Sequence, residues 1–139
     1  MLRPGGLVAL RDAINASLLI WPDDPLIREL GRVVRLGALH SGGNPDVGRE
    51  LGALLHSAGF EDVFLTLGFE QPERPEERAD YFSAVAGFTE GDLAALAVDQ
   101  GWSTAERLAQ GVARCRDLAN QPGSIWALPF GQAIGRKPM

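Results

Sequence analysis

The sequence predicts an α/β fold, and three observations carry that prediction. A short, nearly all-apolar run, "GLVALR" at residues 6–11, has the pattern of a strand that is buried on both faces of a sheet. A helical pattern that ends at Gly59 leads directly into "FEDVFLTLGF", residues 60–69, whose alternation is typical of a strand. Further on, residues 104–118 place their apolar side chains along one side of a helix.

The first third of the chain is predicted to hold a strand and then a helix. Asp12 follows at the point where the first strand would end. Residues 15–21 fit neither period clearly, and "WPDDP", residues 21–25, is typical of a turn. From Leu26 the apolar positions recur at helical spacing, which predicts an amphipathic helix to about Leu39.

A second helix is predicted to begin at "SGGNP". Asn44 is a favourable N-cap, Pro45 suits the first helical position, and Asp46 would interact well with the helix dipole there. The helix would then continue to Gly59, where the strand over residues 60–69 follows.

The second half of the chain is predicted to be mainly helical before a final extended segment. Residues 70–78 form a charged loop broken by prolines, and a helical insertion is expected over residues 75–120. Thr89 with Asp92 and Ser103 with Glu106 have the spacing of capping boxes. The last segment, residues 124–138, reads as extended, with a bulge or bend near its proline and glycine. At 139 residues we expect one domain over residues 1–139.

Composition limits the classes of function. The formal net charge is −5 without any cluster of Lys or Arg, which argues against nucleic acid or an anionic membrane surface as a partner. No apolar run approaches the roughly 20 residues that span a bilayer, and the N-terminal residues do not resemble a secretory signal. A single cysteine excludes an internal disulfide, and no spacing of His, Cys, Asp or Glu suggests a metal site. We therefore expect a cytoplasmic protein.

Three motifs, in order, resemble the C-terminal half of a class I S-adenosylmethionine-dependent methyltransferase. In that family the fifth strand follows a turn of the form L-(K/R)-P-G-G, and residues 2–12 read "LRPGGLVALRD". A helix ending L-L-x-x-A-G-F-x-x-V then leads into the sixth strand, and residues 54–65 read "LLHSAGFEDVFL". The ending "SIWALPFGQAIGRKP", residues 124–138, is similar to the last strand of the small-molecule branch of the family. The resemblance implies a partial Rossmann-like sheet in which this last strand returns antiparallel between the other two.

The family binds its cofactor, S-adenosylmethionine, with the half of the fold that precedes these motifs. That half supplies a glycine-rich loop after the first strand, and no G-x-G sequence occurs in this chain. The resemblance therefore implies that this chain alone has no cofactor-binding residues. It also implies that the strand at Gly6–Arg11 lacks a neighbour, so that its open edge would pair with a second copy of the chain or with a separate N-terminal half. The product of a truncated gene is a third alternative.

Candidate binding residues follow from the position of each side chain. Arg11 and Asp12 lie at the carboxyl end of a predicted strand, where ligands gather in open α/β sheets, although a strand simply ending at the surface looks the same. His40, at a helix end beside glycines, could act as a base or bind a small-molecule acceptor. Three aromatic residues could line an acceptor pocket or simply pack in a core: Trp21, Trp126 and Phe130.

Other candidate residues have a simpler interpretation. Cys115 falls on the apolar side of its helix and is expected to be buried and unreactive, while His56 lies off such a stripe and is expected to be exposed. Three hypotheses about function remain. The chain is the acceptor-binding part of a methyltransferase that needs a cofactor-binding partner, a non-catalytic binding or interaction module derived from one, or a truncated product without a function of its own.

Overall fold

The structure, a computed structural model, describes residues 2–72 and 74–139 and has an α/β fold. Within these residues there are five α-helices and four strands in a mixed sheet with antiparallel pairs. The chain divides into two compact units. We call the first the sheet unit; it holds the described residues up to Ser17, Pro45–Glu70 and those from Leu128 onward. The second, the helical unit, holds Leu18–Asn44 and the described residues of Gln71–Ala127.

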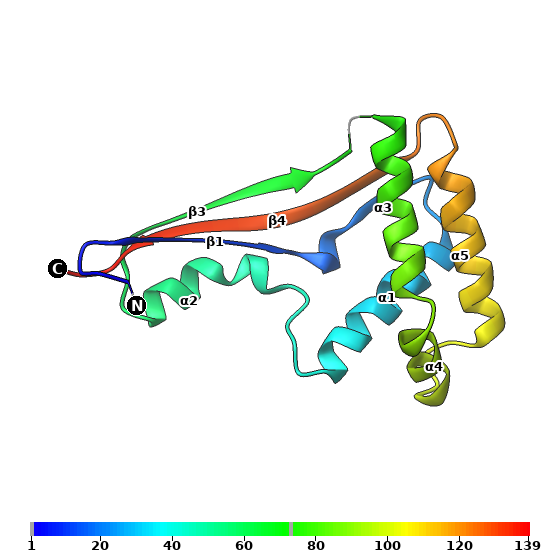
Figure 1. The fold of residues 1–139 in the computed structure, drawn as a ribbon, viewed down its shortest axis with the longest axis horizontal. Coiled ribbons are helices and arrows are strands. Elements are labelled where there is room, and N and C mark those ends of the chain that lie inside the picture. Colours follow the sequence, from blue (N-terminus) through cyan, green and yellow to red (C-terminus); the bar gives the residue numbers. More distant parts are fainter. Residues whose placement is uncertain (1, 73) are drawn as a thin grey trace. The chain divides into compact units, whose positions relative to one another are not determined.

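The sheet unit is built on three strands, and the last strand of the chain lies between the other two. Strand β4 (Ile125–Arg136) pairs antiparallel with β1 (Leu7–Ala13) along one side and with β3 (Glu61–Glu70) along the other (Figure 1). Strands β1 and β3 are therefore parallel to each other, with β4 reversed between them. The prediction that the last strand returns antiparallel between the two earlier ones is confirmed.

One face of this sheet is covered by a helix. Helix α2 (Leu51–Ser57) directs its apolar side toward the sheet, where Leu51 and Leu55 are buried with Ala133 of β4. Each buried leucine contributes roughly 1.5–3 kcal/mol to folding. The left-handed glycine that ends the helix, Gly59 at φ +79°, lies where the sequence predicts it.

The start of this helix differs from the prediction at Asn44–Asp46. Residues Val47–Arg49 form a 3₁₀ turn (η2), and the α-helix begins only at Leu51. The Asp46 side chain is buried and accepts a hydrogen bond from Ala16 N at 2.6 Å, so it caps a different segment of the chain. The predicted N-terminus is wrong because this long-range hydrogen bond competes with local capping.

The opposite face of the sheet carries apolar side chains that no element of the sheet unit covers. Successive residues of a strand point to opposite faces, and the register puts this open face on the odd residues of β1 and the even residues of β3 and β4. Leu7 is 58% exposed there, Phe64 65% and Ile134 45%. A sheet that is apolar on both faces is typical of the interior of an α/β layer.

The outer edge of β1 is also open. Lys137 N donates to Gly6 O, and Ile14 N donates to Pro129 O. Because backbone groups alternate in direction along a strand, these two bonds show that the N–H and C=O groups of the even-numbered residues of β1 point toward β4. The N–H and C=O groups of the odd-numbered residues Leu7, Ala9 and Arg11 therefore point away from β4, and among the described residues no second strand pairs with β1.

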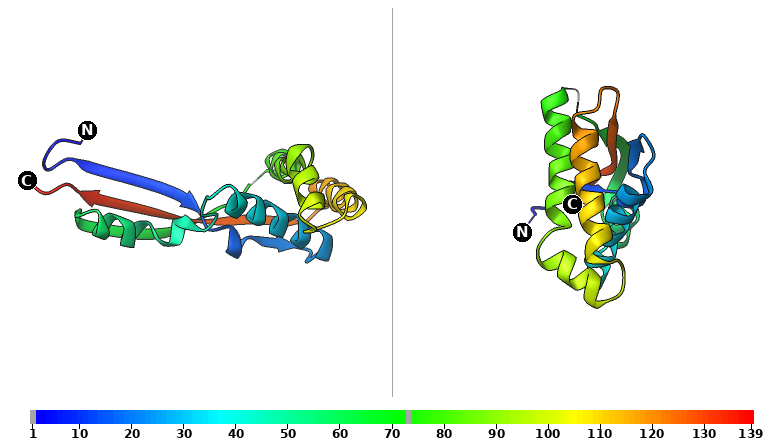
Figure 2. Two further views of the ribbon diagram at one scale, coloured as in Figure 1. Left: turned by 90° about the horizontal axis from the view of Figure 1, so that it is seen from below. Right: turned by 90° about the vertical axis from the view of Figure 1, so that its right-hand side faces the viewer.

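The helical unit packs four helices and a short strand pair around one core. Helix α1 (Pro25–His40) and helix α3 (Pro75–Phe88) both contact α5 (Ala105–Ala119), and α4 (Asp92–Asp99) contacts α1 and α5 (Figure 2). Strand β2 (Leu19–Trp21) pairs with the first three residues of β4, and the 3₁₀ turn η1 (Asn15–Ser17) precedes it in the chain. The core includes side chains from each of these helices, among them Ile27, Leu30, Val33, Phe82, Ala97, Val112, Cys115 and Trp126.

Two predicted helix starts in this unit are displaced. Helix α4 begins after Gly91, whereas the hydroxyl of Thr89 donates to Val85 O and Ala86 O at the end of α3. The N-cap of α5 is Thr104, whose side chain accepts from Arg107 N at 3.2 Å. Ser103, the predicted cap, instead donates to Glu29 of α1. In the described part of the chain no helix is long and apolar enough to cross a membrane.

Candidate functional site

The sheet unit brings together Arg11 and Phe130, two of the predicted site residues. The Arg11 guanidinium lies over the Phe130 ring, 3.7 Å from its centroid, on the open face. Arg11 also forms an ion pair with Glu70 of β3, N to O 3.7 Å, with both side chains about half exposed. Gly68 makes room for the ring, since a Cβ there would lie 3.0 Å from two Phe130 carbons. The open face thus carries a cation fixed by an aromatic ring and a carboxylate.

Asp12 does not join this group. Neighbouring residues of a strand point to opposite faces, so the side chain of Asp12 leaves the sheet on the face opposite Arg11. Its Oδ1 atom accepts from Ala13 N at 2.7 Å. The two residues that the sequence places together at one strand end therefore lie on different faces.

The carboxyl end of β1 is tied down by the segment that precedes α2. Asn15 donates to Pro45 O through its backbone N at 3.2 Å and through Nδ2 at 2.6 Å. Gly48 lies so close that a Cβ would be 2.2 Å from Asp12 O and 2.8 Å from Ala13 O. Only glycine allows this approach of one backbone segment to the other.

The amides at the carboxyl end of β1 are engaged within the chain. The four successive amides of residues 13–16 donate to Asp12 Oδ1, Pro129 O, Pro45 O and Asp46 Oδ1. A ligand at this strand end would therefore find none of these four amides free.

The helical unit holds the other three predicted site residues, and they differ in how far each is buried. Trp126 is 5% exposed and packs edge-on against Phe82, with ring centroids 5.5 Å apart, so it is a core residue. Trp21 is 59% exposed at the end of β2. His40, also exposed, stacks edge-on against Trp102 at a centroid distance of 5.8 Å.

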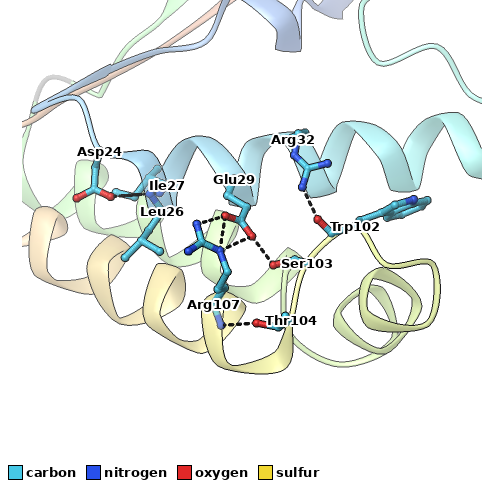
Figure 3. A network of polar contacts seen from close by, with 9 residues as sticks. All are labelled: Asp24, Leu26, Ile27, Glu29, Arg32, Trp102, Ser103, Thr104 and Arg107. Atoms are coloured by element: carbon cyan, nitrogen blue, oxygen red, sulfur yellow. Dashed lines mark hydrogen bonds and ion pairs between the residues drawn. The ribbon is translucent and has the colours of Figure 1, made fainter.

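A polar network that the sequence did not reveal joins α1 to the start of α5 (Figure 3). Glu29 accepts hydrogen bonds from Ser103 and from Arg107, whose Nε lies 2.8 Å from Glu29 Oε2. Arg32, one turn along α1, donates to the carbonyl of Trp102. Only the helical period around Glu29 is visible in the sequence, because its partners lie more than 70 residues away.

Hydrogen bonding shifts the pKa of two carboxyl groups in the helical unit. The hydrogen bonds from Arg107 and then Ser103 lower the pKa of Glu29 to about 2. Burial alone would raise the pKa of Asp24, but bonds from Arg114 and from the amides of Leu26 and Ile27 outweigh it and lower that pKa. Both carboxylates serve to hold helices together, since Asp24 caps α1 and binds Arg114 of α5 at 2.7 Å.

Cys115 is buried in the core of the helical unit, as predicted. Burial, with the Asp24 charge adding to it, raises the pKa of its thiol to about 11. A neutral, enclosed thiol is a poor nucleophile. His56 is exposed, also as predicted. Among residues 2–72 and 74–139, no group of three or more His, Cys, Asp or Glu side chains is arranged to hold a metal ion.

Comparison of the chain with the models of known protein families and with curated proteins gives no match. The function of the chain is therefore inferred from the sequence motifs and from the geometry within each of the two units.

Proposed function

We propose that the chain is the acceptor-binding, C-terminal part of a class I S-adenosylmethionine-dependent methyltransferase. The observation that carries this proposal is the strand order of the sheet unit, in which the last strand lies antiparallel between two parallel strands. That order is the one implied by the motifs at residues 2–12, 54–65 and 124–138, and each motif falls on or beside the expected strand. The sheet is accordingly a part of a Rossmann-like methyltransferase sheet.

The open edge and the open face of the sheet unit both support the proposal that this sheet is incomplete. The outward N–H and C=O groups of Leu7, Ala9 and Arg11 provide a row of free hydrogen-bonding sites for a further strand. In the proposed enzyme a cofactor-binding half, within a longer chain or on a separate one, supplies a strand parallel to β1 and helices over Leu7, Phe64 and Ile134.

A second copy of the chain is the alternative partner at this edge, and the direction of the added strand distinguishes it from a cofactor-binding half. Two copies of β1 that pair about a twofold axis run antiparallel, because each strand must make the same contacts with the other. The strand supplied by a cofactor-binding half would run parallel to β1. The direction of the added strand therefore identifies the partner.

The role of this chain in methyl transfer is to hold the acceptor. Transfer of a methyl group depends mainly on the position of the acceptor, which needs shape and a few polar contacts more than acid–base groups. We assign Arg11, held by Phe130, to contact with a polar or anionic group of a small-molecule acceptor. Trp21 and His40 are exposed on the helical unit and are separate candidates for contact with a small molecule there, and Asp12 is a candidate on the opposite face of the sheet.

A non-catalytic binding module is the second candidate function. Such a module would bind its small molecule whether or not a cofactor-binding half is present.

Complementation tests the proposal. The purified chain is mixed with the cofactor-binding half, strands one to four, of a small-molecule methyltransferase, and complex formation, S-adenosylmethionine binding by calorimetry and methyl transfer to an acceptor panel are measured. We expect a 1:1 complex that binds S-adenosylmethionine, while the chain alone shows no binding. Ile134→Lys, on the open face, should abolish the complex, and Ala53→Lys, exposed on α2, should not. Binding of S-adenosylmethionine by the chain alone would contradict the proposal, as would the absence of a complex.

A further inference from the structure

The helical unit contains an apolar groove that none of the predicted site residues line. It lies between α4 and α5, next to the end of α3, and has a volume of about 710 Å³. Known ligand pockets span about 300–1,000 Å³. The lining residues are mostly small or aliphatic: Ala94, Ala95 and Val98 of α4, and Ala105, Leu108, Ala109 and Val112 of α5.

The groove has an apolar floor and small walls. Leu108 and Val112 are nearly inaccessible to solvent, at 3% and 5% exposure, and form part of the unit's core. The walls carry alanines, whose short side chains leave the space between the two helices unfilled. A longer residue at either wall would occupy the volume directly, which gives a simple way to test it.

The polar groups of the groove gather at its rim. Arg116 of α5 forms an ion pair with Glu90, N to O 3.0 Å, so these two charges largely cancel. Asp99, the last residue of α4, adds an exposed carboxylate. The rim therefore has no net positive charge, and an anionic ligand would meet two carboxylates against one guanidinium.

The one hydroxyl among the lining residues is engaged within its own helix. Thr89 is 1% exposed, and its hydroxyl donates toward Val85 O and Ala86 O, both at 3.1 Å. Thr89 therefore presents no accessible hydroxyl to a ligand, and the interior of the groove suits an apolar molecule.

The dimensions of α4 favour a small molecule over a docked helix. With eight residues, α4 is about 12 Å long and flanks about two turns of any helix laid beside it. A stable protein interface buries about 800 Å² on each partner, which two turns of helix in such a groove do not reach. A molecule of one or two rings fits this length and the volume of the groove.

We propose that the groove between α4 and α5 is a binding site for a neutral, apolar molecule of one or two rings. The apolar floor and the alanine walls hold the rings. The two carboxylates at the rim disfavour a ligand with a carboxylate or phosphate group. This site lies entirely in the helical unit and does not depend on the methyltransferase proposal.

Methyl NMR with 1-naphthol as the probe tests the site. The full chain, with labelled Ala, Leu, Ile and Val methyl groups, is titrated with 1-naphthol, with 1-methoxynaphthalene and with 1-naphthoate. We expect saturable shifts at the methyls of Ala94, Ala95, Val98, Leu108, Ala109 and Val112. Affinity should stay within threefold for the neutral methoxy compound and should fall at least tenfold for the carboxylate.

Three variants complete the test. Ala109→Phe on α5 and Ala95→Phe on α4 fill the groove from opposite walls, and each should weaken 1-naphthol binding at least tenfold. Both alanines are exposed, so the larger ring does not require the core to move, and a cooperative unfolding transition verifies each fold. Ala113→Phe is the matched control, because Ala113 is exposed on α5 but does not line the groove; its affinity should stay within twofold.

Two results would overturn the proposal. In the first, the chemical-shift changes are confined to methyls of the open sheet face, such as those of Leu7 and Ile134, and the groove variants bind 1-naphthol with the affinity of the parent. The second is equal or tighter binding of 1-naphthoate, which would contradict the assigned ligand chemistry.

Discussion

The substitution Glu29→Gln isolates the charge that joins α1 to the start of α5. Glutamine keeps the size of the side chain and an oxygen that Ser103 can bind, but it removes the negative charge opposite Arg107. The same two helices are also joined by the ion pair between Asp24 and Arg114 and by the apolar core, so the loss of this one charge should not unfold the unit. We expect the variant to fold and to be less stable than the parent.

The pKa of Glu29 sets the magnitude. A fall from 4.5 to about 2 corresponds to at most about 3 kcal/mol, at 1.36 kcal/mol per pKa unit. Arg107 is half exposed, so solvent screens part of this interaction, and we expect a loss of about 1–2 kcal/mol at pH 7. Because folding lowers this pKa, the stabilisation is complete above pH 4.5 and is lost as the pH falls toward 2.

Urea unfolding followed by circular dichroism measures the effect. The difference in unfolding free energy between parent and variant should be about 1–2 kcal/mol at pH 7 and should be less than half of its pH 7 value at pH 3. Glu76→Gln is the control, since Glu76 lies 3.8 Å from Arg74 with both side chains 68% exposed, and it should change stability by less than about 0.5 kcal/mol. A difference for Glu29→Gln that stays constant from pH 7 to pH 3 would refute this account of the network.

Two further predictions concern one residue in each unit. Gly48→Ala should lower the free energy of unfolding by about 3 kcal/mol in a thermal or urea experiment, since the added Cβ meets the carbonyls of Asp12 and Ala13. The control is Gly31→Ala, at a helical position where a Cβ would meet nothing within 4 Å beyond its own helix backbone, and it should be neutral or stabilise by up to about 1 kcal/mol. Equal effects of the two substitutions would show that the close approach at Gly48 is absent. Cys115 should react with a disulfide reagent at pH 8 at least 100-fold more slowly in the folded chain than in urea, because its pKa of about 11 and its burial keep it a protected thiol; comparable rates would show that it is accessible.

Strands β1 and β3 and the end of α2 were predictable from the sequence because each depends on local pattern. The run at residues 6–11 and the alternation at residues 60–69 lie within β1 and β3, apart from an offset of a residue or two at their ends. Glycine often ends a helix because it adopts the left-handed conformation without strain, and Gly59 ends α2 in this way. The order of the strands came from the resemblance and not from any pattern within the strands.

Two of the errors, at Asp46 and Ser103, have the same physical cause, which is competition from partners distant in sequence. Asp46 has the local character of a helix start but bonds Ala16, 30 residues earlier. Ser103 has the spacing of a cap but bonds Glu29, 74 residues earlier. At Arg11 and Asp12 the strand end was correct, but the alternation of side chains separates the two residues onto opposite faces. No local pattern indicates Glu70 as the partner of Arg11, since the two meet only when β1 and β3 flank β4.

Hydrogen exchange resolved by residue along β1 is the most direct test of the proposal that the outer edge of this strand has no hydrogen-bonding partner in the monomer. In a dilute monomer we predict slow exchange for the amides of Val8 and Leu10, which face β4, and fast exchange for those of Leu7, Ala9 and Arg11. Addition of the cofactor-binding half should protect that second set. Equal protection of both sets in the monomer would mean that the outer edge of β1 is already satisfied, and it would contradict the proposal that this edge awaits another strand.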